Sequence, residues 1–311
     1  MVMAEPGSEH SKPGSGFPSQ STWKVVVHAF LLVYALILVY IVGGLVFNYQ
    51  PNYNFYFGLS FALFLFALVQ CLYEFGAFRA FLFLVIACLI GFVFEVLGTS
   101  TGFLFGKYSY SSLLGQQVLG VPIVVPLAWF VIAYITFSLT LSSYPPYNMS
   151  EYKGRNFSRI KIRAFILPIL LACFGTVAWD LMIDPMFSSY GYWTWEISSS
   201  APQLYHVPLS NFLGWFVVAL LMLISFVLVL KYASKGPIKL LRKENTWDSR
   251  IAYILLMIDA AVANEKLGQY YAIGIGVTAM CVFLIVTAEV TKNHNESSMR
   301  QESTARLNDP A

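Results

Sequence analysis

Two carboxylates, Glu95 and Asp180, each stand inside an apolar stretch and begin the same series of residues. In each series a glycine follows the acid after 11 residues, and aromatic residues stand two and four positions beyond that glycine. The first series is Glu95, Gly106, Tyr108, Tyr110, Val121, Pro122 and Trp129, and the second is Asp180, Gly191, Trp193, Trp195, Val207, Pro208 and Trp215. A carboxylate within a membrane segment is energetically costly and therefore suggests a functional site. Two acids with the same aromatic set predict one site built from two similar halves.

A third acid, Asp184, stands four residues after Asp180 and therefore on the same helix face, before Pro185 is expected to end that helix. A carboxylic acid in an apolar pocket can remain protonated near neutral pH, and two neighbouring carboxyl groups can share one proton. We therefore expect Glu95, Asp180 and Asp184 to be catalytic acid–base groups. The alternative for any one of them is structural: an ion pair with Lys107, or hydrogen bonds to backbone amides.

The aromatic residues of the two series are candidates for the wall of a pocket. A cation over an aromatic face gains about 0.5–2 kcal/mol. An acid beside such a wall suits protonation of an isoprenoid double bond, because the rings then stabilise the carbocation that forms. Substrate contacts are expected from Tyr108, Tyr110, Trp129, Trp193, Trp195 and Trp215. Tyr and Trp also gather at membrane interfaces in general, which is the alternative for part of this set.

Two polar residues beside the second Val-Pro pair are also candidate substrate-binding residues. His206 stands where the first series has Gly120 and could tune or relay a proton, or could be a surface residue. Asn211 could orient water or satisfy a buried backbone group. Asp259 interrupts the weakest apolar stretch, and we expect it to pair with a polar group elsewhere in the bundle.

The elements that position these residues are expected to be membrane helices. The chain has 311 residues, of which 58% are hydrophobic and 11% charged, whereas a soluble domain has about 25% charged residues. Stretches close to the roughly 20 residues that span a bilayer lie at 25–47, 54–73, 78–97, 121–142, 162–183, 211–231 and 270–290, with a shorter candidate at 250–264. The sequence predicts an all-α polytopic transmembrane helical bundle of about eight spans, with seven possible.

The distribution of basic residues predicts the orientation. With eight spans, 17 of the 19 Lys and Arg residues fall on one side of the membrane, and only Lys107 and Lys266 fall on the other. The positive-inside rule then makes both termini cytoplasmic. Loops 98–120 and 184–210, which hold most of the aromatic residues, are expected on the extracytoplasmic side.

The chain is expected to form a single transmembrane domain over 23–290. Its repeat halves cover about 78–142 and 162–231, as spans 3–4 and 5–6. Repeats of equal orientation are related by a pseudo-two-fold axis along the membrane normal. Residues 1–22 and 291–311 are polar and are expected to be disordered cytoplasmic tails.

Several other kinds of site are not indicated. The sequence has no GxxxxGK[ST], HExxH or GxSxG motif, and its His and Cys residues lack metal-ligand spacing. Its basic residues cluster beside the expected helices, so no nucleic-acid partner is indicated. No metal is expected.

Four blocks carry a resemblance to a known family. These are FEVLGTSTGFLFGKYSY (94–110), GVPIVVPLAW (120–129), AWDLMIDPMF (178–187) and VPLSNFLGW (207–215). In this order they resemble the membrane-bound carotenoid biosynthesis family, which includes bisanhydrobacterioruberin hydratases and the related carotenoid 1,2-hydratases. The resemblance covers about 78–231. His206, where a small residue is expected, departs from the family pattern.

The resemblance implies a hydro-lyase that adds water across the terminal double bond of an acyclic (psi) carotenoid end group and gives a tertiary alcohol. It implies no cofactor. The expected partners are an acyclic carotenoid, water and membrane lipid, with possible contacts to other enzymes of the pathway.

Three alternatives accompany this hypothesis. A membrane transporter could use the buried acids as a proton path, and a carotenoid-binding protein would hold pigment without changing its mass. A membrane prenyltransferase is less favoured. Asp180 and Asp184 form a DxxxD motif, but such an enzyme needs two Asp-rich motifs with basic residues nearby.

Overall fold

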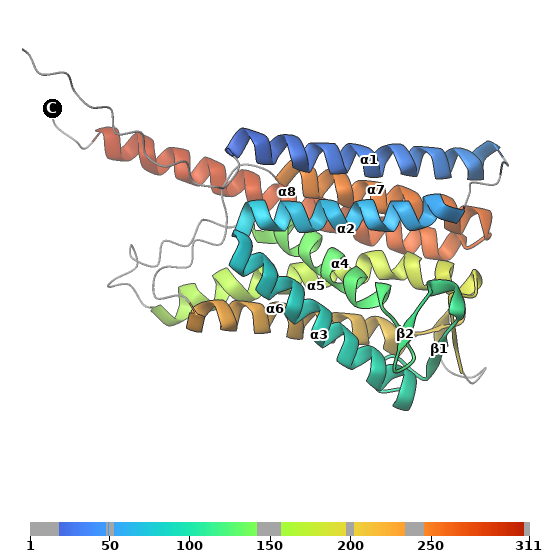
Figure 1. The fold of residues 1–311 in the computed structure, drawn as a ribbon. Helices are drawn as coiled ribbons and strands as arrows, with labels where there is room; N and C mark the ends of the chain where they lie inside the picture. The colour runs from blue at the N-terminus through green and yellow to red at the C-terminus, as the bar shows by residue number, and fades with distance from the viewer. Residues whose placement is uncertain are drawn as a thin grey trace, which may run out of the picture.

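The computed structural model describes residues 19–47, 49, 53–141, 157–196, 202–233 and 246–307. Within these ranges the chain forms a bundle of long helices with short strands gathered at one end (Figure 1). The helices are α1 (Gln20–Phe47), α2 (Tyr53–Phe75), α3 (Ala77–Thr101), α4 (Val124–Leu141), α5 (Phe157–Ser189), α6 (Leu209–Ala233), α7 (Thr246–Lys266) and α8 (Tyr270–Leu307). The strands are β1 (Tyr108–Tyr110), β2 (Gln117–Val118), β3 (Val121–Pro122), β4 (Trp193–Trp195), β5 (Gln203–Leu204) and β6 (Val207–Pro208), and a 3-10 turn, η1, covers Ser112–Leu114. The prediction of an all-α polytopic membrane bundle is confirmed.

Seven of the helices in the described ranges are long and apolar enough to cross a membrane, namely α1 to α6 and α8. The chain is therefore an integral membrane protein. Helix α7 is more polar, but its 21 residues correspond to about 32 Å of helix, and it packs against α1, α4, α5 and α8. It lies within the bundle and corresponds to the predicted weaker eighth span.

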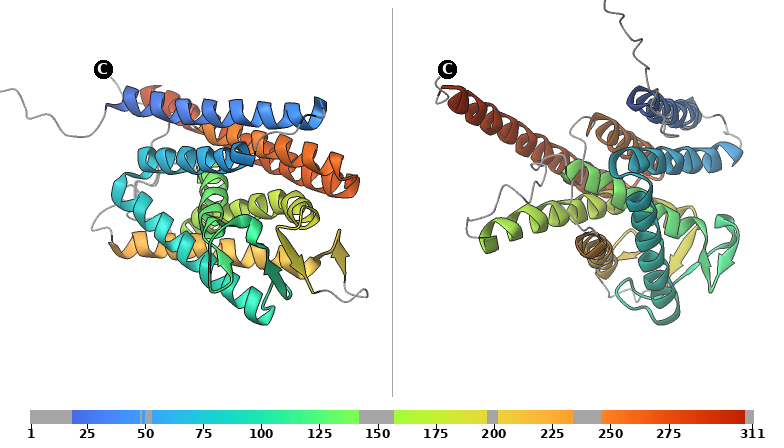
Figure 2. Two further views of the ribbon diagram at one scale, coloured as in Figure 1. Left: turned by 45° about the vertical axis from the view of Figure 1, so that its right-hand side comes forward. Right: turned by 60° about the vertical axis from the view of Figure 1, so that its left-hand side comes forward.

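Helix α4 is the centre of the bundle. Every residue from Trp129 to Thr140 is buried, as expected for a helix that is apolar all round. It packs against α2, α3, α5, α6 and α7. The two further views in Figure 2 show α4 enclosed by the surrounding helices.

The prediction that Pro185 ends its helix is wrong, because α5 continues to Ser189. A proline within a membrane helix is tolerated where neighbouring groups satisfy the backbone around it. Asn264 Nδ2 donates to the carbonyl oxygen of Met182 at 3.0 Å, and Gln269 Nε2 donates to that of Pro185 at 3.2 Å. Polar side chains of α7 and of the α7–α8 turn therefore support the backbone of α5 on both sides of the proline.

The two loop regions pair with each other about a local two-fold axis. Strands β1 and β4 are antiparallel, with Ser109 opposite Thr194 at the centre of the pairing. Ser111 N donates to Tyr192 O at 2.9 Å, and the equivalent bond of the other half, from Glu196 N to Lys107 O, measures 2.8 Å. Each half also forms the same small hairpin, β2–β3 in the first and β5–β6 in the second. The spacing repeat in the sequence is thus a repeat in structure.

Helix α8 extends beyond the bundle and projects away from the end that carries the strands (Figure 1). It ends at Leu307, whereas the polar composition from residue 291 onwards predicts a disordered tail. The segment 291–307 contains no glycine or proline, so nothing in it stops a helix that has already begun. Residues 1–18, most of the expected N-terminal tail, lie outside the described ranges.

Candidate functional site

Glu95 is buried near the strand end of α3 and is surrounded by hydrogen-bond donors. Tyr110 Oη donates to Oε2 at 2.6 Å, and Trp129 Nε1 donates to Oε1 at 2.8 Å. The hydroxyl of Tyr108 also donates to Oε2. The two tyrosines come from β1 and the tryptophan from α4, so all three donors belong to the same repeat half as the acid. Three donors satisfy the oxygens of an ionised carboxylate, which can only accept.

The two tyrosines keep their protons under all ordinary conditions. Burial, followed by the charge of Glu95, raises the pKa of Tyr108 and of Tyr110 well above the usual value. Both hydroxyl groups therefore remain donors to the carboxylate.

Asp180 and Asp184 form a second acidic group, on adjacent turns of α5. Both residues are buried, and the charge of Asp184 acts directly on Asp180. Asn211, at the start of α6, donates from Nδ2 to Asp180 Oδ2 at 3.3 Å and also to Asp184 Oδ2. The amide of Asn211 therefore bridges the two aspartate side chains.

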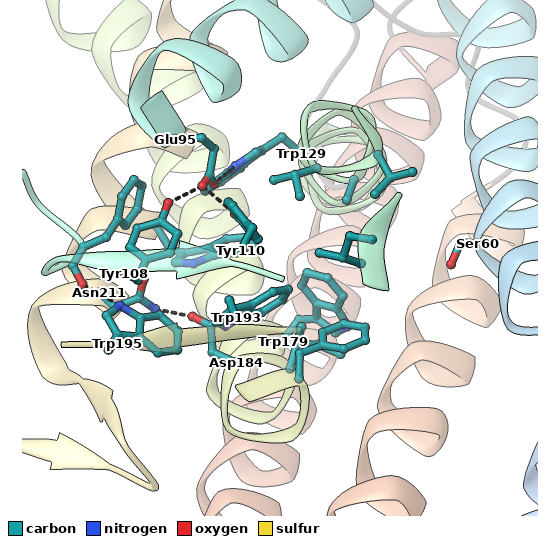
Figure 3. Close-up of a pocket in the computed structure, with 18 residues that line it drawn as sticks. Ser60, Glu95, Tyr108, Tyr110, Trp129, Trp179, Asp184, Trp193, Trp195 and Asn211 are labelled. Atoms are coloured by element: carbon teal, nitrogen blue, oxygen red, sulfur yellow. Dashed lines mark hydrogen bonds between the residues drawn. The ribbon is translucent and has the colours of Figure 1, made fainter. Parts of the chain in front are cut away.

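A cavity of about 160 Å³ lies between Glu95 and Asp184. Figure 3 shows both acids turned towards this space, with tyrosine and tryptophan rings around them. Among the described residues that line it, none is a Lys, Arg or His. The lining residues are Ser60, Glu95, Phe105, Tyr108, Tyr110, Leu114, Val124, Val125, Ala128, Trp129, Trp179, Ile183, Asp184, Phe187, Trp193, Trp195, Asn211 and Trp215.

Pairs of equivalent residues from the two halves form the aromatic wall. Trp129 and Trp215 occupy the same place in the two series and stack with their ring centroids 3.9 Å apart. Across the β1–β4 pairing, Tyr108 contacts Trp195 at 5.6 Å and Tyr110 contacts Trp193 at 5.8 Å between ring centroids. All six aromatic residues expected to contact substrate therefore line one cavity.

The structure does not bring every candidate to this cavity. Asp180 lies behind Asp184 and is absent from the wall. His206 is exposed and occupies the tight turn between β5 and β6, with a φ of 66°. Its counterpart Gly120 has a φ of 80°, so the shared requirement is a left-handed turn residue.

The remaining acids have other surroundings. Lys107 forms its ion pair with the exposed Glu196 at 3.0 Å, which removes it as the partner of a site acid. Asp259 lies on α7, and its charge acts on Tyr34 of α1. The buried hydroxyl of Tyr34 has no hydrogen-bond partner in the described part of the chain. A further acid, Glu74, accepts hydrogen bonds from Tyr134 at 2.7 Å and from Ser138 at 3.0 Å, away from the cavity wall.

Three aromatic residues of the wall are missing from the sequence-based site. Trp179 and Phe187 bracket Ile183 at helical spacing, and all three line the cavity. Their i, i+4, i+8 spacing places them on one face of the helix that carries Asp180 and Asp184, and this spacing could have identified them as wall residues. Phe105, next to Gly106, accepts a hydrogen bond at its carbonyl oxygen from Trp195 Nε1 at 3.1 Å. Nothing in its sequence position distinguished it from the other aromatic residues nearby.

The arrangement can move a proton and stabilise a positive charge. Buried acids stand at the wall of an apolar, ring-lined space, and they meet no basic side chain among the described lining residues. Such a space favours a cationic intermediate, because ring faces and carboxylates both attract it. The described residues contain no group of three His, Cys, Asp or Glu side chains arranged to hold a metal.

Comparison with known proteins gives two matches. The model of the family described as "Carotenoid biosynthesis protein" matches residues 54–283. A bisanhydrobacterioruberin hydratase from Haloarcula japonica is 31% identical over 139 residues, which cover 44% of this chain and 41% of the relative. The match thus spans about two-fifths of the relative's length. No solved structure matches the chain.

Proposed function

Because the chain belongs to the carotenoid biosynthesis protein family, we propose that it is a hydratase of acyclic carotenoids. It adds water across the terminal double bond of an acyclic end group and gives a tertiary alcohol. The observation that carries the proposal is the cavity between Glu95 and Asp184, in which five of the chain's seven tryptophans meet two buried acids. The name of the Haloarcula relative, a hydratase, supports the same reaction class.

The size of the cavity fits the end of a long chain. Its volume is about 160 Å³, below the roughly 300–1,000 Å³ of pockets that enclose whole drug-sized ligands. A carotenoid would place one end group between the acids and leave its polyene between helices or in lipid. Ser60 on α2 and Val125 and Ala128 on α4 add smaller side chains to the lining.

The reaction needs one proton donor and one acceptor. A protonated carboxyl group delivers its proton to the less substituted carbon of the double bond, which leaves a tertiary carbocation. Water then attacks that carbon, and a carboxylate accepts the proton that the water loses. The net change is the addition of one water molecule, and the acid is regenerated.

The aromatic wall stabilises the cation. Each ring face over a desolvated cation contributes about 2 kcal/mol or more. Trp129 and Trp215, stacked at the centre of the two halves, and Trp193 and Trp195 on β4 supply such faces. Glu95 adds a negative charge, which stabilises the cation further.

The proposal is tested in cells that make an acyclic carotenoid and express the chain. Pigments are extracted and their masses are read by chromatography with mass spectrometry. We expect products heavier by one water molecule, or by two where both ends react. Unchanged pigment in cells whose membranes contain the folded protein, with several acyclic carotenoids tried, would overturn the proposal and favour transport or pigment binding.

A further inference from the structure

We infer that Asp184 is the residue that protonates the substrate, that Asp180 acts through it as a positioning residue, and that Glu95 remains ionised throughout the reaction. This assignment rests on the proposed function and divides the work among its three acids.

Only two of the three acids reach the cavity. Asp184 and Glu95 line it, whereas Asp180 does not. Asp180 is in contact with Asp184 and shares with it the amide of Asn211. It can therefore influence a substrate in the cavity only through Asp184.

The acids also differ in their hydrogen bonding. Glu95 accepts from three neutral donors, which stabilises its ionised form. The aspartates have fewer donors and face each other. Asp180 Oδ1 is buried with no hydrogen-bond partner among the described residues, although Asp184 lies beside it. Two buried carboxyl groups in contact cannot both carry a charge without a cation between them, so they share one proton.

The two repeat halves also differ. Asp180 corresponds to Glu95, but Asp184 corresponds to Thr99 in the first series. The Thr99 hydroxyl donates to the carbonyl oxygen of Glu95 at 2.9 Å, within its own helix. At these two equivalent positions only the second half therefore has a pair of carboxyl groups. The two halves differ at the place where the pair shares its proton.

The other groups that face the pair contribute no positive charge. Glu95 on α3 and Tyr108 on β1 act on Asp184 across the cavity. Asn211 on α6 donates to Asp184 as a neutral group, and the neutral Trp215 of the same helix lines the cavity beside it. No described Lys, Arg or His stands at the cavity wall to replace the shared proton.

The step balances within the pair. The O–H bond of Asp184 breaks as a C–H bond forms at the less substituted alkene carbon, and the π electrons of the alkene supply that bond. Both aspartates are then ionised beside the newly formed carbocation, which compensates the second charge. They take one proton back from the water that attacks the tertiary carbon. The pair ends with the proton it began with. Glu95 neither donates nor accepts a proton, and it acts only through its negative charge.

The first test measures protonation without any substrate. Purified protein in light and heavy water is compared by infrared spectroscopy, in which the carbonyl stretch of a protonated carboxyl group shifts on deuteration. We expect Asp184→Asn to lose one such band and Glu95→Gln to retain it. Asp259→Asn serves as the control for a partly buried carboxyl group outside the site. Loss of the band in Glu95→Gln, or no loss in Asp184→Asn, would overturn the inference even if the protein is a hydratase.

The second test examines Asp180 by the pH profile of hydration. Asp180→Asn removes the neighbouring charge that holds the proton on Asp184, so the alkaline limb of the rate profile should move to lower pH. Asp184→Asn should lower the rate by about 100-fold or more at every pH. A purely structural role for Asp180 would lower the rate and leave the limb in place, which would contradict the assignment. If no variant and no wild-type protein hydrates any carotenoid, the proposed function fails and the infrared result still stands.

Discussion

At the scale of residues, the site depends on how each buried oxygen is satisfied. Glu95 has a donor for each oxygen, and Asn211 bridges the two aspartates. A hydrogen bond to a charged group contributes about 1.5–3 kcal/mol to stability. A buried polar group left without its partner costs about 1–3 kcal/mol, and a charged group costs more. The polar side chains around the cavity therefore affect both stability and activity.

Tyr110→Phe should destabilise the protein by about 1.5–3 kcal/mol, because it removes the hydroxyl that donates to Glu95 at 2.6 Å and keeps the ring. Unfolding of the detergent-solubilised protein, followed by tryptophan fluorescence, measures the change. Tyr270→Phe is the matched control, since Tyr270 is 66% exposed. Equal stability of the two variants would mean that the Glu95 contact contributes nothing to folding.

The sequence singled out Glu95 and the six aromatic residues that line the cavity, because equal spacing in two series indicates equivalent places in two halves. It could not distinguish Asp180 from Asp184, since both lie on one helix face and only packing decides which of them meets the cavity. The structure places His206 in a turn outside the cavity lining. A histidine beside a Val-Pro pair looks like a functional group, whereas its backbone conformation, which sequence spacing does not reveal, makes it a turn residue.

At the scale of elements, the strand pair β1–β4 joins the two halves beside the cavity. Strand β1 packs closely against α3 because α3 has a glycine, Gly98, at the point of contact. A Cβ atom on Gly98 would lie 2.7 Å from Phe105 Cδ2 and 2.8 Å from Tyr108 Cε1. The absence of a side chain at Gly98 therefore allows the aromatic wall to approach the helix that carries Glu95.

Gly98→Ala should lower stability by about 1–3 kcal/mol, the usual cost of overpacking, and should reduce hydration by displacing Tyr108. Gly274→Ala on α8 is the control, because a Cβ atom there meets no atom within 4 Å. Thermal unfolding and product yield are measured for both. If Gly98→Ala unfolds at the same temperature as Gly274→Ala, the close approach of α3 to the strand is not required.

His206→Gly should preserve hydration and raise the unfolding temperature. A left-handed conformation costs a non-glycine residue roughly 1–2 kcal/mol, and glycine adopts it without that cost. The measurement is product yield together with thermal unfolding. A large loss of activity in a folded variant would instead support the proton-relay role that the sequence suggested for His206.

At the scale of the whole molecule, the spans were predictable because long apolar stretches in a weakly charged chain have few alternatives to membrane helices. The arrangement of the bundle was not predictable in the same way. Nothing in its apolar composition marked α4 as the central helix, because every span is apolar and only mutual packing decides which one is buried all round. Helix α8 also extends to Leu307, well beyond the apolar stretch 270–290 from which its span was predicted.

The end of the bundle that carries the strands is predicted to face the extracytoplasmic side. A cysteine at Leu119, a 72% exposed position in the β2–β3 turn, should react with a membrane-impermeant maleimide in intact cells. A cysteine at Ser19, just before α1, should react only after lysis. Both are introduced after the four native cysteines are replaced by serine or alanine. The reverse pattern of labelling would contradict the orientation.

The most direct measurement of the central claim is hydration by purified protein in water enriched in oxygen-18. An acyclic carotenoid in detergent or lipid vesicles is incubated with the wild-type chain and with Asp184→Asn, and the products are read by mass spectrometry. We expect the wild-type protein to give a tertiary alcohol that carries the heavy oxygen, and Asp184→Asn to give at least about 100-fold less of it. Product without the heavy oxygen, or equal product from the two proteins, would contradict that claim.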